Sequence, residues 1–134
     1  MAKNSDTNAY DDVRTLNLRA KELLARYGRQ AVEARKTAFV DPEAKKAAEE
    51  HAAIIEKDIT ELSSKIGEVE KKHAKWAPAP KSGRDYQRAL QVGSEYVEIM
   101  DQAQNTAGTS AVELVCIMND NNIQAEEASK QPTA

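Results

Sequence analysis

Apolar residues recur at steps of three and four through two long stretches of the chain, which predicts two amphipathic helices. In the first stretch, residues 9–38, the repeating positions are Val13, Leu16, Ala20, Leu23, Leu24, Tyr27, Ala31, Ala34 and Ala38. In the second, residues 42–76, steps of four and three alternate without a break at Ala48, Ala52, Ile55, Ile59, Leu62, Ile66, Val69, His73 and Trp76. An alternation of this kind is typical of a coiled-coil seam.

A helix-start signal separates the two stretches. Asp41 suits the N-cap, Pro42 the first helical position, and Glu43 the first turn, where a negative charge is favourable. Because so few residues connect the two helices, they are expected to form an antiparallel hairpin.

A proline-rich segment follows the second helix. Trp76 runs into Ala-Pro-Ala-Pro, and a proline ring cannot continue the helical hydrogen-bond ladder. We therefore interpret Trp76 as the plug at the end of the seam and the segment after it as a turn-forming connector. A third helix is predicted over residues 84–104, returning along the hairpin.

The apolar run from Val112 to Met118 predicts a short fourth helix over residues 110–119. Ser110 and Glu113 have the spacing of a capping box at its start. Valine and isoleucine also favour strands, but the chain offers no second strand for this run to pair with. The asparagine-rich residues 119–122 are expected to end the helix.

Together these elements predict an all-α fold, an elongated helical bundle in which a long antiparallel α-hairpin with a coiled-coil-like seam is packed by one or two further helices. The length of 134 residues suits one domain, placed at residues 9–122. Residues 1–8 and the polar residues 123–134 are expected to be disordered.

Composition narrows the classes of partner. A net charge of −3 gives no general attraction to nucleic acid or to an anionic membrane. The sequence also lacks the apolar stretch of a secretory signal or of a membrane span, which needs about 18 residues. One cysteine in the chain fits a reducing compartment. The expected location is the cytoplasm, with leaderless export or incorporation in a particle left open.

A second apolar stripe runs along the other side of the first helix, where Leu18, Ala25, Val32 and Phe39 recur every seven residues. A surface helix should be polar there. Either the stripe binds a partner helix or another copy of the chain, or the first helix lies between two neighbours in its own bundle and buries both sides. The sequence alone does not decide between these interpretations.

The first helix is also rich in basic residues, among them Arg26 and Arg29. Nucleic acid is one conceivable partner, but acidic residues are interleaved at helical spacings, as in Glu22 to Arg26, and no aromatic side chains are interleaved for base stacking. An acidic protein partner fits the pattern better. Val112, Val115 and Met118, on the fourth helix, form the second candidate interface.

Candidate chemistry is sparse. Glu70 and His73 have the Glu-x-x-His spacing that di-metal helical bundles use twice, but the chain contains one copy and a metal site needs several converging ligands. Cys116 lies in an apolar run without a basic neighbour in the sequence and is interpreted as an inert core residue. We predict no catalytic residues, no cofactor and no metal.

The sequence therefore predicts a non-enzymatic protein–protein interaction or assembly protein, of the adaptor or chaperone-like kind, that binds a protein partner or forms a homo-oligomer. One alternative is a self-assembling structural component of a phage particle or secretion apparatus. The other, with less support, is a metal-binding or enzymatic bundle.

Overall fold

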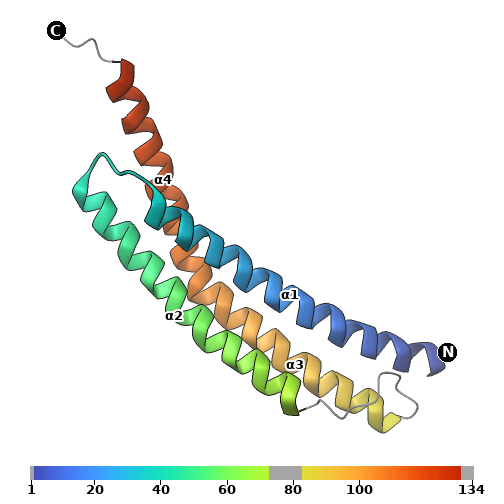
Figure 1. Ribbon diagram of the computed structural model, residues 1–134. Coiled ribbons are helices and arrows are strands. Elements are labelled where there is room, and N and C mark those ends of the chain that lie inside the picture. The colour runs from blue at the N-terminus through green and yellow to red at the C-terminus, as the bar shows by residue number, and fades with distance from the viewer. Residues whose placement is uncertain (1, 73–82, 131–134) are drawn as a thin grey trace.

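The computed structural model of the protein describes residues 2–72 and 83–130, and the side chains of residues 13–72, 87 and 90–130. Over these ranges the chain forms α1 (Ala2–Lys36), α2 (Pro42–Lys72), α3 (Gly83–Asn105) and α4 (Ala107–Lys130), with no strand among them (Figure 1). The predicted all-α class is confirmed. The seam residues His73 and Trp76 lie outside the described residues.

The helices form an elongated, gently curved rod (Figure 1). α1 and α2 make the predicted antiparallel hairpin, α3 returns along it, and α4 continues in the direction of α3 past the turn between α1 and α2. α1 packs mainly on α3 and α2, whereas α4 packs mainly on α2. The hairpin is thus covered on one side by two helices laid end to end.

Local sequence signals place the start of α2 where they were predicted. The helix begins at Pro42, and the Asp41 carboxylate accepts a hydrogen bond from the Glu43 amide (Oδ1 to N, 3.0 Å). This satisfies one of the amide groups that a helix start leaves without a partner.

The core divides into two clusters along the rod. The first joins α1, α2 and α3 through Val13, Ala20, Leu24, Leu62, Ile66, Val69, Val92, Tyr96, Ile99 and Ala103. The second joins α1, α2 and α4 through Ala31, Ala34, Ala48, Ala52, Ile55, Ala107, Ala111 and Leu114. The predicted seam of α2 is buried from Ala48 to Val69, apart from the half-buried Ile59. The alanine-rich second cluster allows α4 to approach the hairpin closely.

The start of α4 differs from the prediction. The helix begins at Ala107, and the amide of Ala107 donates to the buried carboxylate of Asp58 on α2 (N to Oδ2, 3.2 Å). Ser110 is itself buried, with its Oγ 3.3 Å from Nδ1 of His51. The predicted capping box at Ser110 is therefore wrong, because a side chain from another helix caps α4.

The predicted end of the fourth helix is also wrong, because α4 continues to Lys130. Asn121 is buried and holds the turn between α1 and α2. Its Oδ1 accepts from the Val40 amide (2.9 Å) and its Nδ2 donates to the Ala38 carbonyl (3.1 Å). Because both polar groups of the Asn121 side chain are hydrogen-bonded to this turn, they do not compete for the backbone hydrogen bonds of α4.

Residues at both ends of the chain that were predicted to be disordered are helical. Residues 123–130 complete α4, where Glu126 and Lys130 form an ion pair at 3.5 Å, and residues 2–8 belong to α1. Extending a helix that is already nucleated needs much less free energy than starting one. The buried parts of α1 and α4 supply that nucleus.

Gly108 marks a close approach of α4 to α1. A Cβ atom at this position would lie 2.8 Å from the hydroxyl oxygen of Tyr27. We expect Gly108→Ala to lower the free energy of unfolding, because overpacking costs about 1–3 kcal/mol and the helix propensity of alanine returns only about 1 kcal/mol. Tyr27→Phe removes that oxygen, so the same substitution should cost less in this background. A double-mutant cycle measured by urea denaturation gives the coupling free energy between positions 27 and 108. If Gly108→Ala costs the same free energy in the wild type and in Tyr27→Phe, the predicted clash with the Tyr27 hydroxyl is wrong.

Candidate functional site

The apolar stripe predicted on the first helix remains exposed on α1. Leu18 and Val32 are 59% and 47% exposed, and Ala25 is exposed between them. α1 does contact three other helices, but it uses its opposite face for them. The interpretation in which the bundle buries both sides of this helix is therefore wrong for these residues. We call Leu18, Ala25 and Val32 the α1 stripe.

Phe39 does not belong to this stripe. α1 ends at Lys36, and the half-buried Phe39 packs against the second core cluster from the turn that follows. Seven-residue spacing places side chains on one face only while the chain is helical. The prediction for Phe39 is wrong because the helix ends before it.

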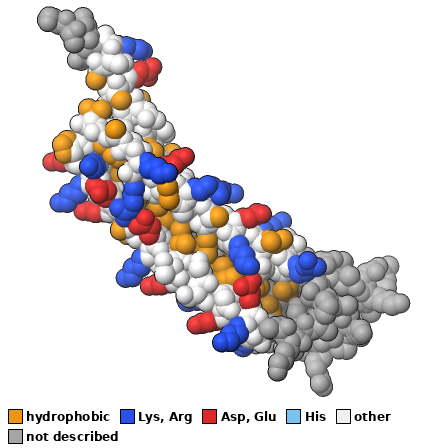
Figure 2. All heavy atoms as spheres, viewed as in Figure 1, with side chains coloured by type: hydrophobic (Ala, Val, Ile, Leu, Met, Phe, Trp, Pro, Cys, Tyr) orange, Lys and Arg blue, Asp and Glu red, His pale blue; other side chains and the backbone are white. Residues whose placement is uncertain are grey.

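An apolar groove of about 410 Å³ lies beside the α1 stripe, between α1 and α2. Ala25, which belongs to the stripe, lines it together with Leu24, Gly28, Ile59, Ser63, Ile66 and Gly67. Figure 2 shows hydrophobic side chains gathered in a band along the middle of this face, with charged side chains on both sides. The small residues on both helices leave its apolar floor open to solvent.

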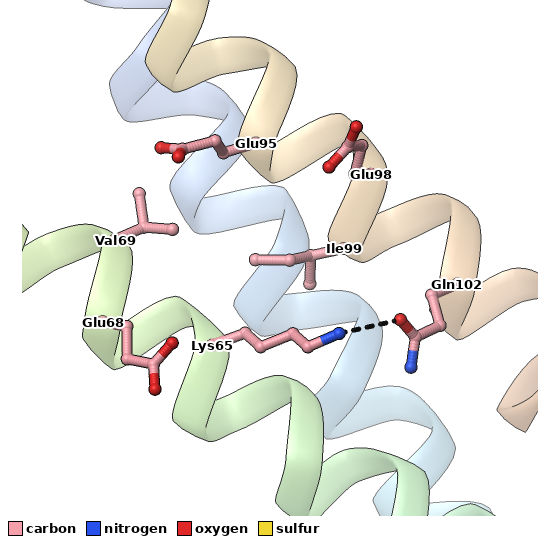
Figure 3. A pocket seen from close by; sticks show the side chains of 7 residues that line it. All are labelled: Lys65, Glu68, Val69, Glu95, Glu98, Ile99 and Gln102. Carbon is pink, nitrogen blue, oxygen red and sulfur yellow. Dashed lines mark hydrogen bonds between the residues drawn. The ribbon is translucent and has the colours of Figure 1, made fainter.

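A second groove, of about 280 Å³, lies between α2 and α3 and is mainly charged (Figure 3). Glu68 on α2 and Glu95 and Glu98 on α3 line it. Lys65 crosses toward α3, where its Nζ donates to Oε1 of Gln102 at 3.1 Å. The Glu95 and Glu98 carboxylates of α3 thus lie in an open cleft.

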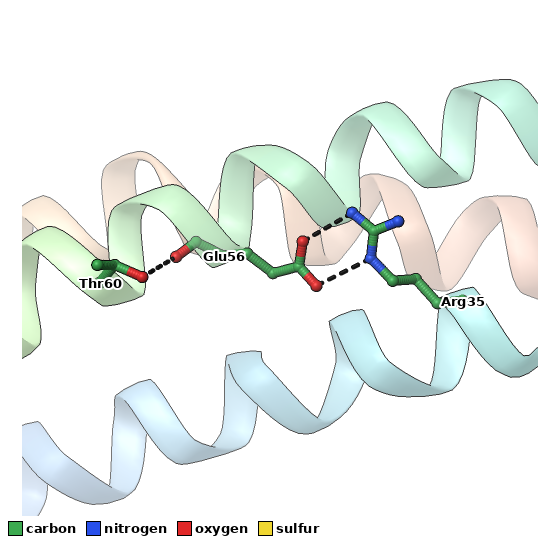
Figure 4. A network of polar contacts seen from close by, with 3 residues as sticks. All are labelled: Arg35, Glu56 and Thr60. Atoms are coloured by element: carbon green, nitrogen blue, oxygen red, sulfur yellow. Dashed lines mark hydrogen bonds and ion pairs between the residues drawn. The ribbon is translucent and has the colours of Figure 1, made fainter.

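Two ion pairs join α1 to α2. Lys21 and Glu70 line the apolar groove, with Lys21 Nζ 2.7 Å from Glu70 Oε2. Farther along the hairpin, the Arg35 guanidinium donates two hydrogen bonds to the Glu56 carboxylate, at 2.8 and 2.7 Å (Figure 4). The hydrogen bond from Arg35 lowers the pKa of Glu56, and that from Lys21 lowers the pKa of Glu70. These charges are therefore matched inside the chain.

Asn17 extends the network at Glu70 into the core. Its Nδ2 donates to Glu70 Oε2 (3.2 Å) and to the hydroxyl oxygen of Tyr96 (2.8 Å). Tyr96 is buried in the first core cluster, and this burial raises the pKa of its hydroxyl. The hydrogen bond from Asn17 satisfies an oxygen that burial would otherwise leave without a partner.

The basic residues Arg26 and Arg29 differ from Lys21 and Arg35. Both are exposed, and neither forms an ion pair with another residue whose side chain the structure describes. They leave positive charge on the solvent side of α1.

On α4, the structure divides the predicted interface residues between two faces. Val112 and Val115 are 62% and 44% exposed, whereas Met118 is half-buried against the second core cluster. Cys116 is exposed, so its interpretation as a core residue is wrong. Ile123, 53% exposed, was missed because its segment was expected to be disordered. Ile123 lies eleven residues, or three helical turns, after Val112, so the two residues share one face of α4. A predicted helix that extended beyond residue 119 would have placed Ile123 on that face.

We call Val112, Val115, Cys116 and Ile123 the α4 stripe. The opposite side of the same helix is buried through Ala107, Ala111 and Leu114. α4 therefore carries apolar side chains on two opposite faces, of which its own bundle covers one.

The described residues show neither a metal site nor a membrane-spanning helix. No group of three or more His, Cys, Asp and Glu side chains among them could hold a metal ion. Glu70, half of the predicted Glu-x-x-His pair, is engaged with Lys21, and His73 lies outside the described range. None of the described helices combines the length and apolar character needed to cross a bilayer.

Comparisons with protein-family models, with curated proteins and with solved structures find no match to this chain.

Proposed function

We propose that this protein is a non-enzymatic binding or assembly protein of the cytoplasm that holds a protein partner, or further copies of itself, against α1. The α1 stripe, exposed beside an apolar groove, is the observation that carries the proposal. Grooves of this kind accept the apolar face of an amphipathic helix. Contiguous apolar surface on a folded protein commonly marks such a contact.

Charge supports a particular kind of partner. Arg26 and Arg29 lie on the exposed side of α1 without an ion-pair partner among the described side chains. Charges around an interface steer encounter and select partners of opposite sign. An acidic helical surface is the partner that suits α1 best.

A self-assembling structural component, as in a phage particle or a secretion apparatus, is the second candidate function. The α4 stripe favours it, because a chain with exposed apolar stripes on two helices offers two contact surfaces. In this case copies of the chain would themselves be the partner.

Site-specific photo-crosslinking in the cells that make the protein tests the proposed function. A photoreactive residue at Val32 is expected to give a crosslinked product, whereas the same residue at Lys57, on an exposed part of α2, is expected to give none. The mass of the product distinguishes a second copy from a different protein. No product at Val32, or equal yields at the two positions, would contradict the proposal.

A further inference from the structure

We propose that the chain assembles head to tail, with the α4 stripe of one copy packed along the α1 stripe and its groove on the next copy. This inference rests on the proposed function and specifies its partner as a second copy of the chain.

The two stripes cannot meet within one chain. α4 contacts the hairpin through its buried side, which places Val112 and Cys116 on the opposite side of the helix, away from α1 and α2. The α1 stripe belongs to neither core cluster. Any contact between the stripes must therefore join two molecules.

α4 also projects beyond the rest of the bundle. Residues 122–130 are all exposed, and in Figure 1 the C-terminal part of α4 extends past the turn between α1 and α2. A short helix in water is only marginally stable without packing on one face. A neighbouring molecule would supply that packing and cover Ile123.

The lengths of the two stripes agree. At 1.5 Å per residue, the α4 stripe from Val112 to Ile123 spans roughly 16 Å, and the α1 stripe from Leu18 to Val32 spans roughly 21 Å. The small residues Ala25 and Gly28, in the groove beside the α1 stripe, allow a second helix to approach α1 closely. One helix can thus lie along the other over the whole apolar contact.

Charge distinguishes head-to-tail pairing from symmetric pairing. Exposed acidic residues, Glu113, Asp120 and Glu127, border the α4 stripe. On the outer side of α1 the exposed basic residues Arg19, Arg26, Arg29 and Lys36 outnumber the exposed acids Glu22 and Glu33. Pairing α4 with α4 would bring acidic residues together, and pairing α1 with α1 would bring two surfaces with an excess of positive charge together. Like charges at an interface are unfavourable. Pairing α4 with α1 places opposite charges together.

A head-to-tail contact leaves one free stripe at each end of a pair of molecules. Such heterologous contacts continue into rings or open filaments, whereas symmetric contacts stop at two copies. The expected product is therefore a series of oligomers whose length increases with protein concentration.

The test is absolute mass by light scattering behind size exclusion, over about a hundredfold range of concentration. We expect the mass of the full chain to exceed the monomer value of 14.8 kDa and to rise with concentration. Added salt should lower it, because the contact joins opposite charges. A monomer at every concentration, or a mass independent of salt, would overturn the proposal.

Two variants and their mixture identify the contact. Val32→Glu and Val112→Glu change exposed side chains, so each variant should fold with the circular dichroism of the wild type and remain monomeric. Mixed together, they retain one intact pair of stripes and are expected to form a 1:1 dimer and nothing larger. Val97→Glu, at a 41% exposed position on α3, is the matched control and should assemble like the wild type.

Other results would reject this contact in distinguishable ways. If Val112→Glu is monomeric while Val32→Glu still assembles, α4 pairs with α4 and the head-to-tail arrangement is wrong. If the mixture stays monomeric, the stripes do not bind each other. A monomeric wild-type chain that still crosslinks to a different protein from Val32 would overturn this inference and leave the proposed function standing.

Discussion

Replacing Leu62 by aspartate is expected to unfold the protein. Leu62 is completely buried in the first core cluster, at the centre of the α2 seam. The substitution loses roughly 1.5–3 kcal/mol of leucine burial and places a carboxylate without a partner in an apolar environment, at a further cost of several kcal/mol. A domain of this size is stable by only about 5–15 kcal/mol. We expect the helical circular dichroism signal and the cooperative thermal transition to be lost or greatly reduced.

Ser64→Asp is the matched control for this prediction. Ser64 is exposed on the same helix, two residues after Leu62, so the same new charge meets water there. Its free energy of unfolding should stay within about 0.5 kcal/mol of the wild type. A Leu62→Asp variant with the melting temperature of Ser64→Asp would show that the seam does not hold the bundle together.

Two equivalent positions of the α2 seam, Ile59 and Ile66, differ in how deeply they are buried. In the sequence, Ile59 and Ile66 are equivalent positions, and a charge at either should be equally harmful. In the structure Ile66 is 3% exposed, whereas Ile59 is half-buried, and both line the apolar groove. The pattern identifies the face of α2 that points inward, but how deeply each residue is buried depends on the neighbouring helices.

The features predicted correctly depend on residues close together in the chain. The Asp41–Pro42 helix start needs only the few residues around it, and the periodic faces of α1 and α2 need only repeated spacing. Both signals are complete before any tertiary contact forms. The hairpin and the all-α class follow from them.

The features predicted wrongly depend on residues far apart in the chain. α4 is capped by Asp58, which lies 49 positions before Ala107, and Asn121 is satisfied by the turn at Ala38 and Val40, more than 80 positions away. No local pattern contains either interaction. The ends of α4 were therefore misplaced.

For the candidate site, the sequence identified apolar positions but could not assign them to faces. The run from Val112 to Met118 is apolar on all sides of the helix, so its periodicity does not show which side is buried. Packing against the hairpin covers Leu114 and Met118 and leaves Val112 and Cys116 exposed. The α1 stripe was found because its seven-residue spacing is separate from the core spacing of the same helix.

The second large effect is expected at Asp58, a buried carboxylate at the junction of α3 and α4. Its Oδ2 accepts a hydrogen bond from the Ala107 amide at 3.2 Å, and its Oδ1 accepts one from Nε2 of Gln102 on α3 at 3.3 Å. A negative charge at the first residue of α4 also interacts favourably with the helix dipole. Asp58→Ala leaves both donors without this acceptor, and we expect the free energy of unfolding to fall by about 1–3 kcal/mol.

Asp58→Asn is the conservative variant for this position. It keeps an oxygen that can accept from Ala107 but lacks the charge, so its loss of stability should lie between those of the wild type and Asp58→Ala. Urea denaturation measures the three free energies of unfolding. Native-state hydrogen exchange at the Ala107 amide gives a local readout, since this amide should exchange faster in Asp58→Ala. Equal stability and equal protection of Ala107 in all three proteins would contradict the role assigned to Asp58.

The junction also connects stability to the proposed assembly. Asp58 fixes where α4 begins, and the position of α4 against the hairpin decides which of its side chains face solvent. We therefore expect Asp58→Ala to weaken head-to-tail association although Asp58 is buried and belongs to neither stripe. If Asp58→Ala is destabilised and still associates like the wild type, the α4 stripe does not depend on the capped junction for its presentation.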